Sequence, residues 1–475
     1  MPDFDLCYLS ASEAIDLFKE RTLSPVELLE ALIARAETVE PKINAFADTY
    51  FEEALDKAHK AEARYMKTDG RLRSLEGIPI AVKDESPLKG KHTTQGSLIF
   101  KDHVDTETSV LATRLQRAGA IFHARTTTPE FCAVGVCHSR LWGVTRNPWN
   151  GEFTPGGSSG GSAAALAAGS ATLATGTDIG GSIRIPAACC GVVGYKPPYG
   201  RNPELPVFNL DFYSHSGPLA RTVRDCALMQ NVLAGPHPKD IASLKPKKRV
   251  PLQHDGIEGW RIAYSVDMGY FQVDPDVRRN TEAALDVFRG LGATVEEVSI
   301  GWTEECQTAA LNYLDHLFGA SMARYLAEHR DIMTDYVIGI AERAQKSTAE
   351  DFLRSLEVAV EVYDTFGPMI ERHDVFICPT NAIPAVGAEQ DPIDPDFTID
   401  GVKMDADYGW VMTHPFNMLS RCPVLSVPSG RAANGVPTGI QIVGRTYDDT
   451  SVFRAAAAFE QAAPWLDAPE RRPAL

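Results

Sequence analysis

Short apolar runs alternate with amphipathic helical patterns along most of this sequence, and that alternation restricts the fold more than any other feature. Strand-like runs are expected at residues 78–82, 120–124, 171–175, 192–195, 261–264, 294–298, 375–378, 424–427 and 439–443. Helical patterns lie between most of them, at residues 110–117, 222–234, 277–290, 347–371 and 450–461. Alternation of this kind is typical of a sheet covered by helices. The sequence therefore predicts an α/β protein: a single large α/β/α domain with a mixed, largely parallel central sheet and helices on both faces.

The first seventy residues have a different, helical pattern. Ser24 is followed by Pro25 and Glu27, which combines an N-cap serine, a proline at the first helical position and a capping-box glutamate. This helix is expected to end at Pro41, and a second helix is expected over 52–66. We therefore predict an N-terminal helical segment, residues 1–70, that packs on a main domain formed by residues 71–475.

Charge and composition exclude several functions. A formal net charge of −17 in 475 residues argues against a nucleic-acid partner, because such proteins contact phosphates with clustered Lys and Arg. The chain begins without a basic and apolar leader, and no run approaches the roughly 18 apolar residues of a membrane helix. The 9 cysteines are scattered, and Cys132, Cys137 and His138 lack a second pair at zinc spacing. We expect a cytoplasmic protein without a metal or other cofactor.

A glycine- and serine-rich block at residues 154–162 is the densest local signal. It has no Lys before Ser or Thr, so it is not a phosphate-binding P-loop. The segment from Gly156 to Gly160 fits the G-x-S-x-G pattern of a nucleophile elbow. A flexible helix start remains the simpler interpretation of this block alone.

A second block, at residues 176–186, places Gly180 and Gly181 directly before Ser182. Two glycines before a serine can direct consecutive backbone N–H groups at one point, as an oxyanion hole requires. Taken alone, such a sequence is more often only a turn.

Lys83 ends the apolar run at 78–82 and is followed by Asp84. Burial disfavours the charged form of a lysine, and an uncharged lysine can act as a general base. An ordinary ion pair between Lys83 and Asp84 is the alternative interpretation.

Taken together, these three blocks resemble the amidase signature family. The matching stretches are residues 77–84 (Gly-Ile-Pro-Ile-Ala-Val-Lys-Asp), 155–162 (Pro-Gly-Gly-Ser-Ser-Gly-Gly-Ser) and 177–184 (Thr-Asp-Ile-Gly-Gly-Ser-Ile-Arg). Ser158 and Ser182 are 24 residues apart, which is the family's spacing between its two catalytic serines. The resemblance extends over roughly residues 60 to 460, and its motifs occur in the family's order.

The resemblance implies a role for each matching residue. Lys83 corresponds to the catalytic base, Ser158 to a proton relay that follows a cis peptide bond, and Ser182 to the nucleophile. The oxyanion hole corresponds to the backbone N–H groups of Ile179, Gly180, Gly181 and Ser182. Asp178 and Arg184 correspond to polar positions that brace the loop. The family's reaction is hydrolysis of a carboxylic amide through a seryl acyl-enzyme, and the expected partner is a small-molecule amide.

Other functions remain open from the sequence alone. A member of the same family can be the amidase subunit of an aminoacyl-tRNA amidotransferase, although the acidic charge and the lack of a basic tail disfavour this. An α/β-hydrolase esterase would use Ser158 or Ser159 with a later histidine such as His414. A non-catalytic binding or scaffold protein on the same fold is the third alternative. The sequence does not determine the oligomeric state, and a homodimer is one option.

Substrate choice depends on segments outside the matching blocks. The expected pocket insertions are residues 301–343 and 381–421, which are rich in apolar and aromatic residues: Trp302, Tyr313, Trp410, Met412, His414, Phe416 and Met418. Glu85 and Thr127 stand where many relatives carry Asn. We expect these differences to affect substrate choice and to leave the three catalytic positions untouched.

Overall fold

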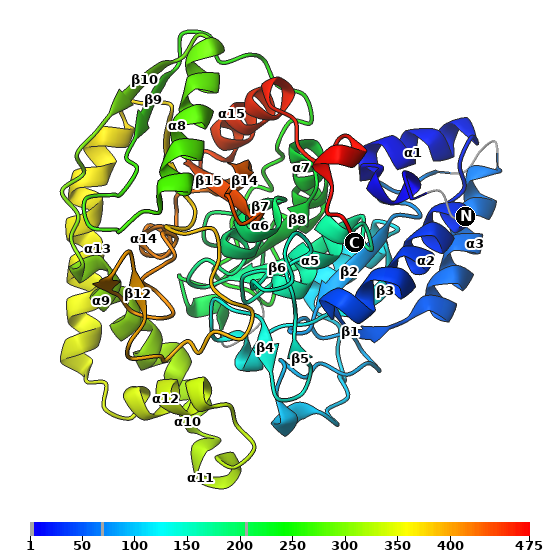
Figure 1. Ribbon diagram of the computed structural model, residues 1–475. Coiled ribbons are helices and arrows are strands. Elements are labelled where there is room, and N and C mark those ends of the chain that lie inside the picture. Colours follow the sequence, from blue (N-terminus) through cyan, green and yellow to red (C-terminus); the bar gives the residue numbers. More distant parts are fainter. Residues whose placement is uncertain (1–3, 68–70, 205–207) are drawn as a thin grey trace.

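One sheet of eleven strands runs through the computed structural model, which describes residues 4–67, 71–204 and 208–475 (Figure 1). The strand order is β1-β3-β2-β6-β8-β7-β14-β15-β11-β9-β10. The bounds are β1 Phe46–Thr49, β2 Pro79–Lys83, β3 Ile121–Thr126, β6 Leu173–Asp178, β7 Val193–Lys196, β8 His215–Ala220, β9 Arg261–Tyr264, β10 Thr294–Glu297, β11 Val375–Pro379, β14 Val424–Arg431 and β15 Pro437–Val443. Two small hairpins stand apart from it: β4 His138–Ser139 with β5 Gly143–Val144, and β12 Thr398–Ile399 with β13 Val402–Lys403.

The sheet is mixed, as expected. Strand β2 pairs in parallel with β3 and β6, and β9 pairs in parallel with β10 and β11. The strands between these groups, from β6 through β8, β7, β14 and β15 to β11, pair antiparallel. This middle part is more antiparallel than we expected, because β7 and β8, and likewise β14 and β15, are joined by loops rather than by a crossover helix.

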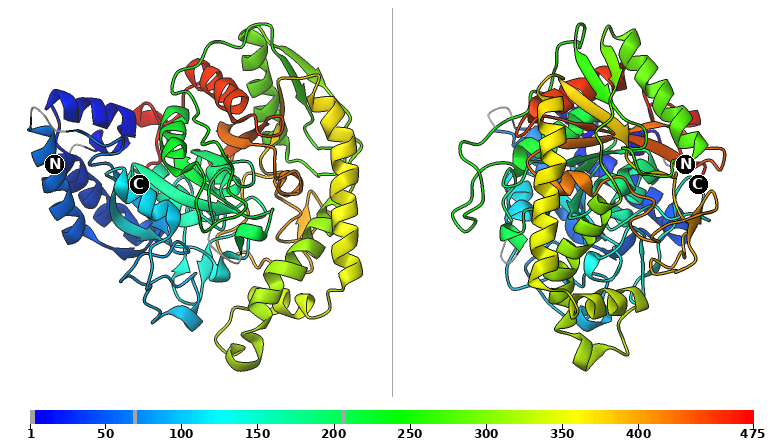
Figure 2. Two further views of the ribbon diagram at one scale, coloured as in Figure 1. Left: turned by 180° about the vertical axis from the view of Figure 1, so that it is seen from behind. Right: turned by 90° about the vertical axis from the view of Figure 1, so that its left-hand side faces the viewer.

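Helices cover both faces of the sheet (Figure 2). On one face α7, α8 and α15 share an apolar cluster with the strands. On the other face α5 and α6 belong to one such cluster and α13 to another. The larger helices are α1 Ala11–Glu20, α2 Pro25–Ile43, α3 Phe51–Tyr65, α4 Val110–Arg117, α5 Gly160–Ala168, α6 Arg184–Cys190, α7 Val223–Leu233, α8 Pro275–Gly290, α9 Glu305–Leu314, α12 Asp335–Ala344, α13 Ala349–Ile370 and α15 Asp449–Ala462. The short ones are α10 Ala320–Ala323, α11 Leu326–His329 and α14 Pro415–Met418. In the described part of the chain no helix is long and apolar enough to cross a membrane.

The first seventy residues contribute α1, α2 and α3, which lie on the side of the molecule opposite α13 (Figure 1). The capping box at Ser24 and Glu27 is present. Pro41 does not end α2 as expected: the helix continues to Ile43, because a proline in the last turn removes only its own N–H bond. These residues also supply β1, which pairs with β3 at the edge of the sheet.

Three elements that position the site were not predicted. Strand β8 contains Gly217 and Pro218, which interrupt a strand-like pattern. Helices α5 and α6 consist largely of small residues, so they lack the apolar periodicity on which a helix prediction depends. All residues of both helices are buried, and this close packing requires small side chains.

Candidate active site

Lys83 and Ser158 meet at the end of strand β2. Lys83 is the last residue of β2 and is completely buried, and its Nζ donates to Ser158 Oγ at 2.8 Å. Ser158 lies just before α5, after a cis peptide bond from Gly157. The structure thus brings together two residues that are far apart in the sequence and that the resemblance pairs.

Two further oxygens surround the amine of Lys83. Its Nζ donates to Thr177 Oγ1 at 2.6 Å and lies 3.2 Å from Glu85 Oε2. Thr177 Oγ1 in turn donates to Glu85 Oε2. The expectation that Glu85 would leave the catalytic positions untouched is therefore wrong, because the turn after β2 folds its carboxylate back onto Lys83.

Asp84 has other partners. Its carboxylate accepts a hydrogen bond from the backbone N–H of Thr94 at 2.8 Å and lies 3.8 Å from Arg125 Nη1. The alternative ion pair between Lys83 and Asp84 is thus not formed among the described residues. The carboxylate next to Lys83 is Glu85.

Ser182 lies in the turn between β6 and α6, beside the Lys83–Ser158 pair. Its backbone carbonyl accepts from the N–H of Ser159 at 3.2 Å, which ties the two serine segments together. Its side chain is 8% exposed, and in the described chain its hydroxyl makes no hydrogen bond, including none to Ser158. The hydroxyl is free to turn toward a substrate.

The turn before α6 carries unpaired backbone donors. Within the described residues, the N–H groups of positions 179–182 donate to no other protein group, which is the condition for binding an oxyanion. Gly181 has φ +133°, and a Cβ there would lie 2.0 Å from Thr413 Oγ1. That hydroxyl donates to the carbonyl of Gly180 at 2.6 Å. Only glycine at position 181 leaves room for the Thr413 side chain to lie this close to the backbone.

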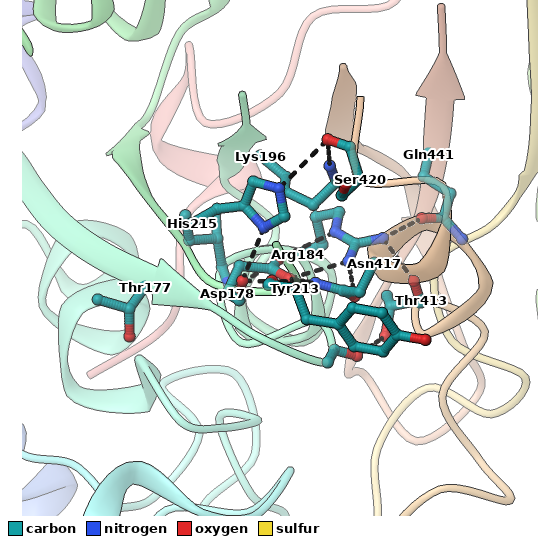
Figure 3. A network of polar contacts seen from close by, with 12 residues as sticks. Thr177, Asp178, Arg184, Lys196, Tyr213, His215, Thr413, Asn417, Ser420 and Gln441 are labelled. Carbon is teal, nitrogen blue, oxygen red and sulfur yellow. Dashed lines mark hydrogen bonds and ion pairs between the residues drawn. The ribbon is translucent and has the colours of Figure 1, made fainter. Parts of the chain in front are cut away.

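A buried polar network connects the residues on either side of this turn, Asp178 and Arg184 (Figure 3). Arg184 binds both carboxylate oxygens of Asp178 at 2.9 Å. Its remaining donors reach Asn417 Oδ1 at 2.7 Å, Gln441 Oε1 at 2.9 Å and the carbonyl of Thr413 at 2.9 Å. Arg184 and Asp178 are both fully buried, so the bracing role is the one that their contacts support.

The charge of Asp178 depends on Arg184. Burial by itself would raise the pKa of this carboxyl, but the charge and hydrogen bonds of Arg184 hold the pKa well below its usual range. Asp178 is therefore ionised at neutral pH. Its Oδ2 also accepts from the N–H of Ile183 at 3.3 Å, directly after Ser182.

Arg184→Ala is expected to reduce the free energy of unfolding by about 3–5 kcal/mol, because it leaves the Asp178 carboxylate buried without a counter-charge. Urea unfolding measures this loss. Arg289→Ala is the matched control, since Arg289 pairs with Asp286 on the exposed face of α8 and its loss should cost less than about 1 kcal/mol. Equal stability of the two variants would contradict the bracing role.

The structure does not support a nucleophile elbow with a histidine base. Ser158 Oγ accepts from Lys83, and Ser159 Oγ donates to the carbonyl of Thr177 at 3.4 Å. His414 is buried and lies 3.2 Å from the hydroxyl of Tyr270, and burial lowers its pKa to about 3. In the described chain no histidine hydrogen-bonds to either serine, so the esterase alternative lacks its base.

Cys132 and Cys137 are packed in the interior beside the site. Cys132 and Cys137 are buried, and burial raises the pKa of both thiols. Thr128 Oγ1 donates to Cys132 Sγ at 3.2 Å. Among the residues that the structure describes, no group of three or more His, Cys, Asp or Glu could hold a metal ion.

The apolar and aromatic residues noted in the two expected pocket segments are packed in the interior. All seven are buried: Trp302, Tyr313, Trp410, Met412, His414, Phe416 and Met418. A cavity of about 680 Å³ does lie between the two expected insertions, but its walls carry many charges. Its charged lining residues are Glu304, Asp315, Arg343, Asp394, Lys403, Asp405 and Asp407. Tyr408 also lines it, and the Tyr408 hydroxyl lies 2.6 Å from the position of a Cβ on Gly180. Tyr408, one of the residues that line the cavity, therefore packs against the turn that carries Ser182.

A serine free to attack, a lysine in contact with a second serine and a turn with unpaired N–H groups provide what acyl transfer through a serine requires. On an α/β sheet, this defines a class of serine-dependent acyl-transferring enzymes without a histidine base. The sequence model described as Amidase matches residues 27–453, and the chain therefore belongs to the amidase family.

Relatives from two functional groups match almost the whole chain. An acylamidase from Rhodococcus erythropolis is 34% identical over 472 residues, covering 98% of each chain. A glutamyl-tRNA(Gln) amidotransferase subunit from Geobacter metallireducens is 34% identical over 494 residues, covering 97% of this chain and 98% of the relative. A solved bacterial aryl acylamidase of the amidase signature family superposes with a TM-score of 0.89 at 32% identity, covering 96% of this chain and 97% of the other.

Proposed function

We propose that this enzyme hydrolyses the C–N bond of a small-molecule carboxylic amide through an acyl-enzyme on Ser182. The observation that carries the proposal is the 2.8 Å contact between Lys83 Nζ and Ser158 Oγ, next to the turn that bears Ser182. A fully buried lysine in contact with a serine is suited to move a proton. The net charge of −17 favours a free small molecule in the cytoplasm over a nucleic acid.

The proposed cycle needs only these groups. Ser182 Oγ attacks the amide carbon while its proton passes to Ser158, whose own proton passes to Lys83. The oxyanion rests on the N–H groups of residues 179–182. Collapse of this intermediate breaks the C–N bond as the proton returns from Lys83 through Ser158 to the leaving nitrogen. Water then attacks the acyl-enzyme with the same relay and releases the carboxylate.

Amide hydrolysis by the isolated chain tests this function. The purified protein should release carboxylate and amine or ammonia from some member of a panel of aryl, aliphatic and amino-acid amides, measured by mass spectrometry. No release from any member would overturn the proposal.

The amidotransferase role is the second candidate, because the glutamyl-tRNA(Gln) amidotransferase relative matches as closely as the acylamidase does. That role requires glutamine as the ammonia source and a partner protein. Stable co-purification with a second protein, together with activity only in that complex, would favour it over the free hydrolase.

We also propose that residues 71–475 carry catalysis, that residues 1–70 pack on this domain, and that residues 301–343 and 381–421 form the substrate pocket. The 680 Å³ cavity supports the last assignment, because every residue that lines it except Val134 comes from these two segments. Partly exposed apolar side chains also lie in the cluster to which Ile179 belongs, namely Phe212, Tyr270, Phe318 and Tyr408.

Neutral amides with partly apolar acyl groups should be hydrolysed faster than dicarboxylic ones. Apolar side chains near Ile179 favour an apolar acyl group, and the carboxylates around the cavity repel a second negative charge. We expect kcat/KM for phenylacetamide to exceed that for malonamate at least tenfold at pH 7.5. A faster rate on malonamate would contradict this assignment of the pocket.

A further inference from the structure

Glu85 is a charged neighbour of the catalytic lysine that takes no part in the proton relay itself. The three oxygens around Lys83 Nζ come from Ser158 at 2.8 Å, Thr177 at 2.6 Å and Glu85 at 3.2 Å. A protonated lysine has three N–H donors, and each has an oxygen acceptor here. The geometry is that of an ammonium group with a carboxylate counter-ion.

The two members of this pair differ in their access to solvent. Lys83 is fully buried, whereas the Glu85 side chain is 32% exposed. Thr177 Oγ1 lies between them, accepting from Lys83 and donating to Glu85. Glu85 is therefore held in one orientation against Lys83 while remaining in reach of water, which solvates its charge.

We propose that Glu85 is a positioning residue that stabilises the proton on Lys83 during acyl transfer and thereby shifts the working range of this enzyme toward alkaline pH. The inference rests on the proposed function. Burial alone favours an uncharged lysine, whereas a carboxylate at 3.2 Å favours the charged one. A higher pH is then needed to produce uncharged Lys83. Once uncharged, Lys83 is the stronger base and takes the proton of Ser182, through Ser158, more readily.

Other titratable and charged groups lie on the segments that surround the pair. They are Asp84, Arg125, Cys132, Cys137 and Glu204. Burial raises the pKa of both thiols, so neither carries charge at neutral pH. The charge of Asp84 is opposed by Arg125 at 3.8 Å.

Glu204 is the group most easily confused with Glu85. Burial raises its pKa to about 8, and the charge of Glu85 contributes to that rise. Glu204 is thus largely protonated at pH 7 and titrates in the range where the effect of Glu85 is sought. In the described chain, Glu85 is the one carboxylate in ion-pair contact with Lys83.

Glu85→Gln tests the inference, because glutamine keeps the length and an acceptor for Thr177 but removes the charge. The pH dependence of kcat/KM should keep its rising limb, with the midpoint at least about one pH unit lower than in the wild type. The plateau should also fall, since the base is weaker. The labelling rate of Ser182 with a fluorophosphonate, measured over the same pH range, should shift by the same amount.

Glu204→Gln is the matched control. The midpoint of its kcat/KM pH profile should stay within about 0.3 pH units of the wild-type value, which is much less than the one-unit shift expected when a charge in direct contact with Lys83 is removed. A midpoint unchanged or raised in Glu85→Gln overturns the inference, as does a limb that disappears in Glu204→Gln. A melting temperature measured for each variant separates these results from misfolding. If the wild type hydrolyses no amide and Ser182 is not labelled, the proposed function fails. If the wild type shows the rising limb and Glu85→Gln does not shift its midpoint, only the role of Glu85 fails.

Discussion

Ser182→Ala is expected to lower kcat/KM for amides by on the order of 10⁴- to 10⁶-fold, the loss that follows removal of a serine nucleophile. The folded structure should be unaffected, because the Ser182 hydroxyl makes no hydrogen bond within the described chain and its side chain is slightly exposed. The melting temperature should therefore remain within about 2 °C of the wild type. Steady-state kinetics and thermal unfolding measure the two expectations.

The site of covalent labelling identifies the nucleophile directly. A fluorophosphonate probe followed by peptide mass mapping should place the adduct on the peptide that contains Ser182. Ser159→Ala is the matched control, since among the described residues the Ser159 hydroxyl bonds only backbone groups of Thr177. This variant should still be labelled on Ser182. An adduct on Ser158 or Ser159 would support an elbow nucleophile instead.

The sheet could largely be predicted because most of its strands are short apolar runs. The run at 261–264 is strand β9 with the same bounds, and the run at 375–378 differs from β11 by one residue. All of β11 and the two central residues of β9 are buried by helices, and burial on both faces produces an apolar run. Strand β8 was missed because Gly217 and Pro218 are typical of a turn rather than of a central strand. Its pairing with β6 and β7 cannot be deduced from the sequence.

The three catalytic candidates could be predicted because they occur in motifs whose order and spacing match a family. Their neighbours could not, since contacts between side chains depend on how strands pair. Lys83 and Thr177 are at the ends of β2 and β6, which run parallel and adjacent, so their side chains meet at one edge of the sheet. A prediction that β2 and β6 are neighbours would have revealed Thr177.

The contact between Glu85 and Lys83 could not be predicted for a different reason. Glu85 stands where many relatives carry Asn, and from this we expected an effect on substrate choice. In the structure the tight turn after β2, in which the Glu85 N–H donates to the Lys83 carbonyl at 2.7 Å, directs its carboxylate to the lysine. The side chains that line the pocket could not be predicted either. Aromatic content cannot distinguish a cavity wall from a core, and here Trp410 and Phe416 are fully buried.

Lys83→Ala is expected to lower kcat/KM for amides by several orders of magnitude, because it removes the group that accepts the proton of Ser182 and returns it to the leaving nitrogen. The loss should be smaller for activated esters, whose leaving groups need little protonation. Steady-state assays of the wild type and of Lys83→Ala, with an amide and a p-nitrophenyl ester of the same acyl group, measure the loss of kcat/KM on each substrate.

The pH profile separates a lysine base from any histidine base. A lysine must be uncharged to accept a proton, so wild-type activity should rise with pH to a plateau, and Lys83→Ala should lose that limb. Arginine at position 83 should not restore it, since a guanidinium does not give up its proton. His414→Gln should retain the limb, because burial lowers the pKa of His414 to about 3 and the ring is already uncharged throughout the working range. Near-normal amide hydrolysis by Lys83→Ala with an unchanged profile would show that the proton of Ser182 leaves by another route, and the Lys83–Ser158–Ser182 relay would have to be abandoned.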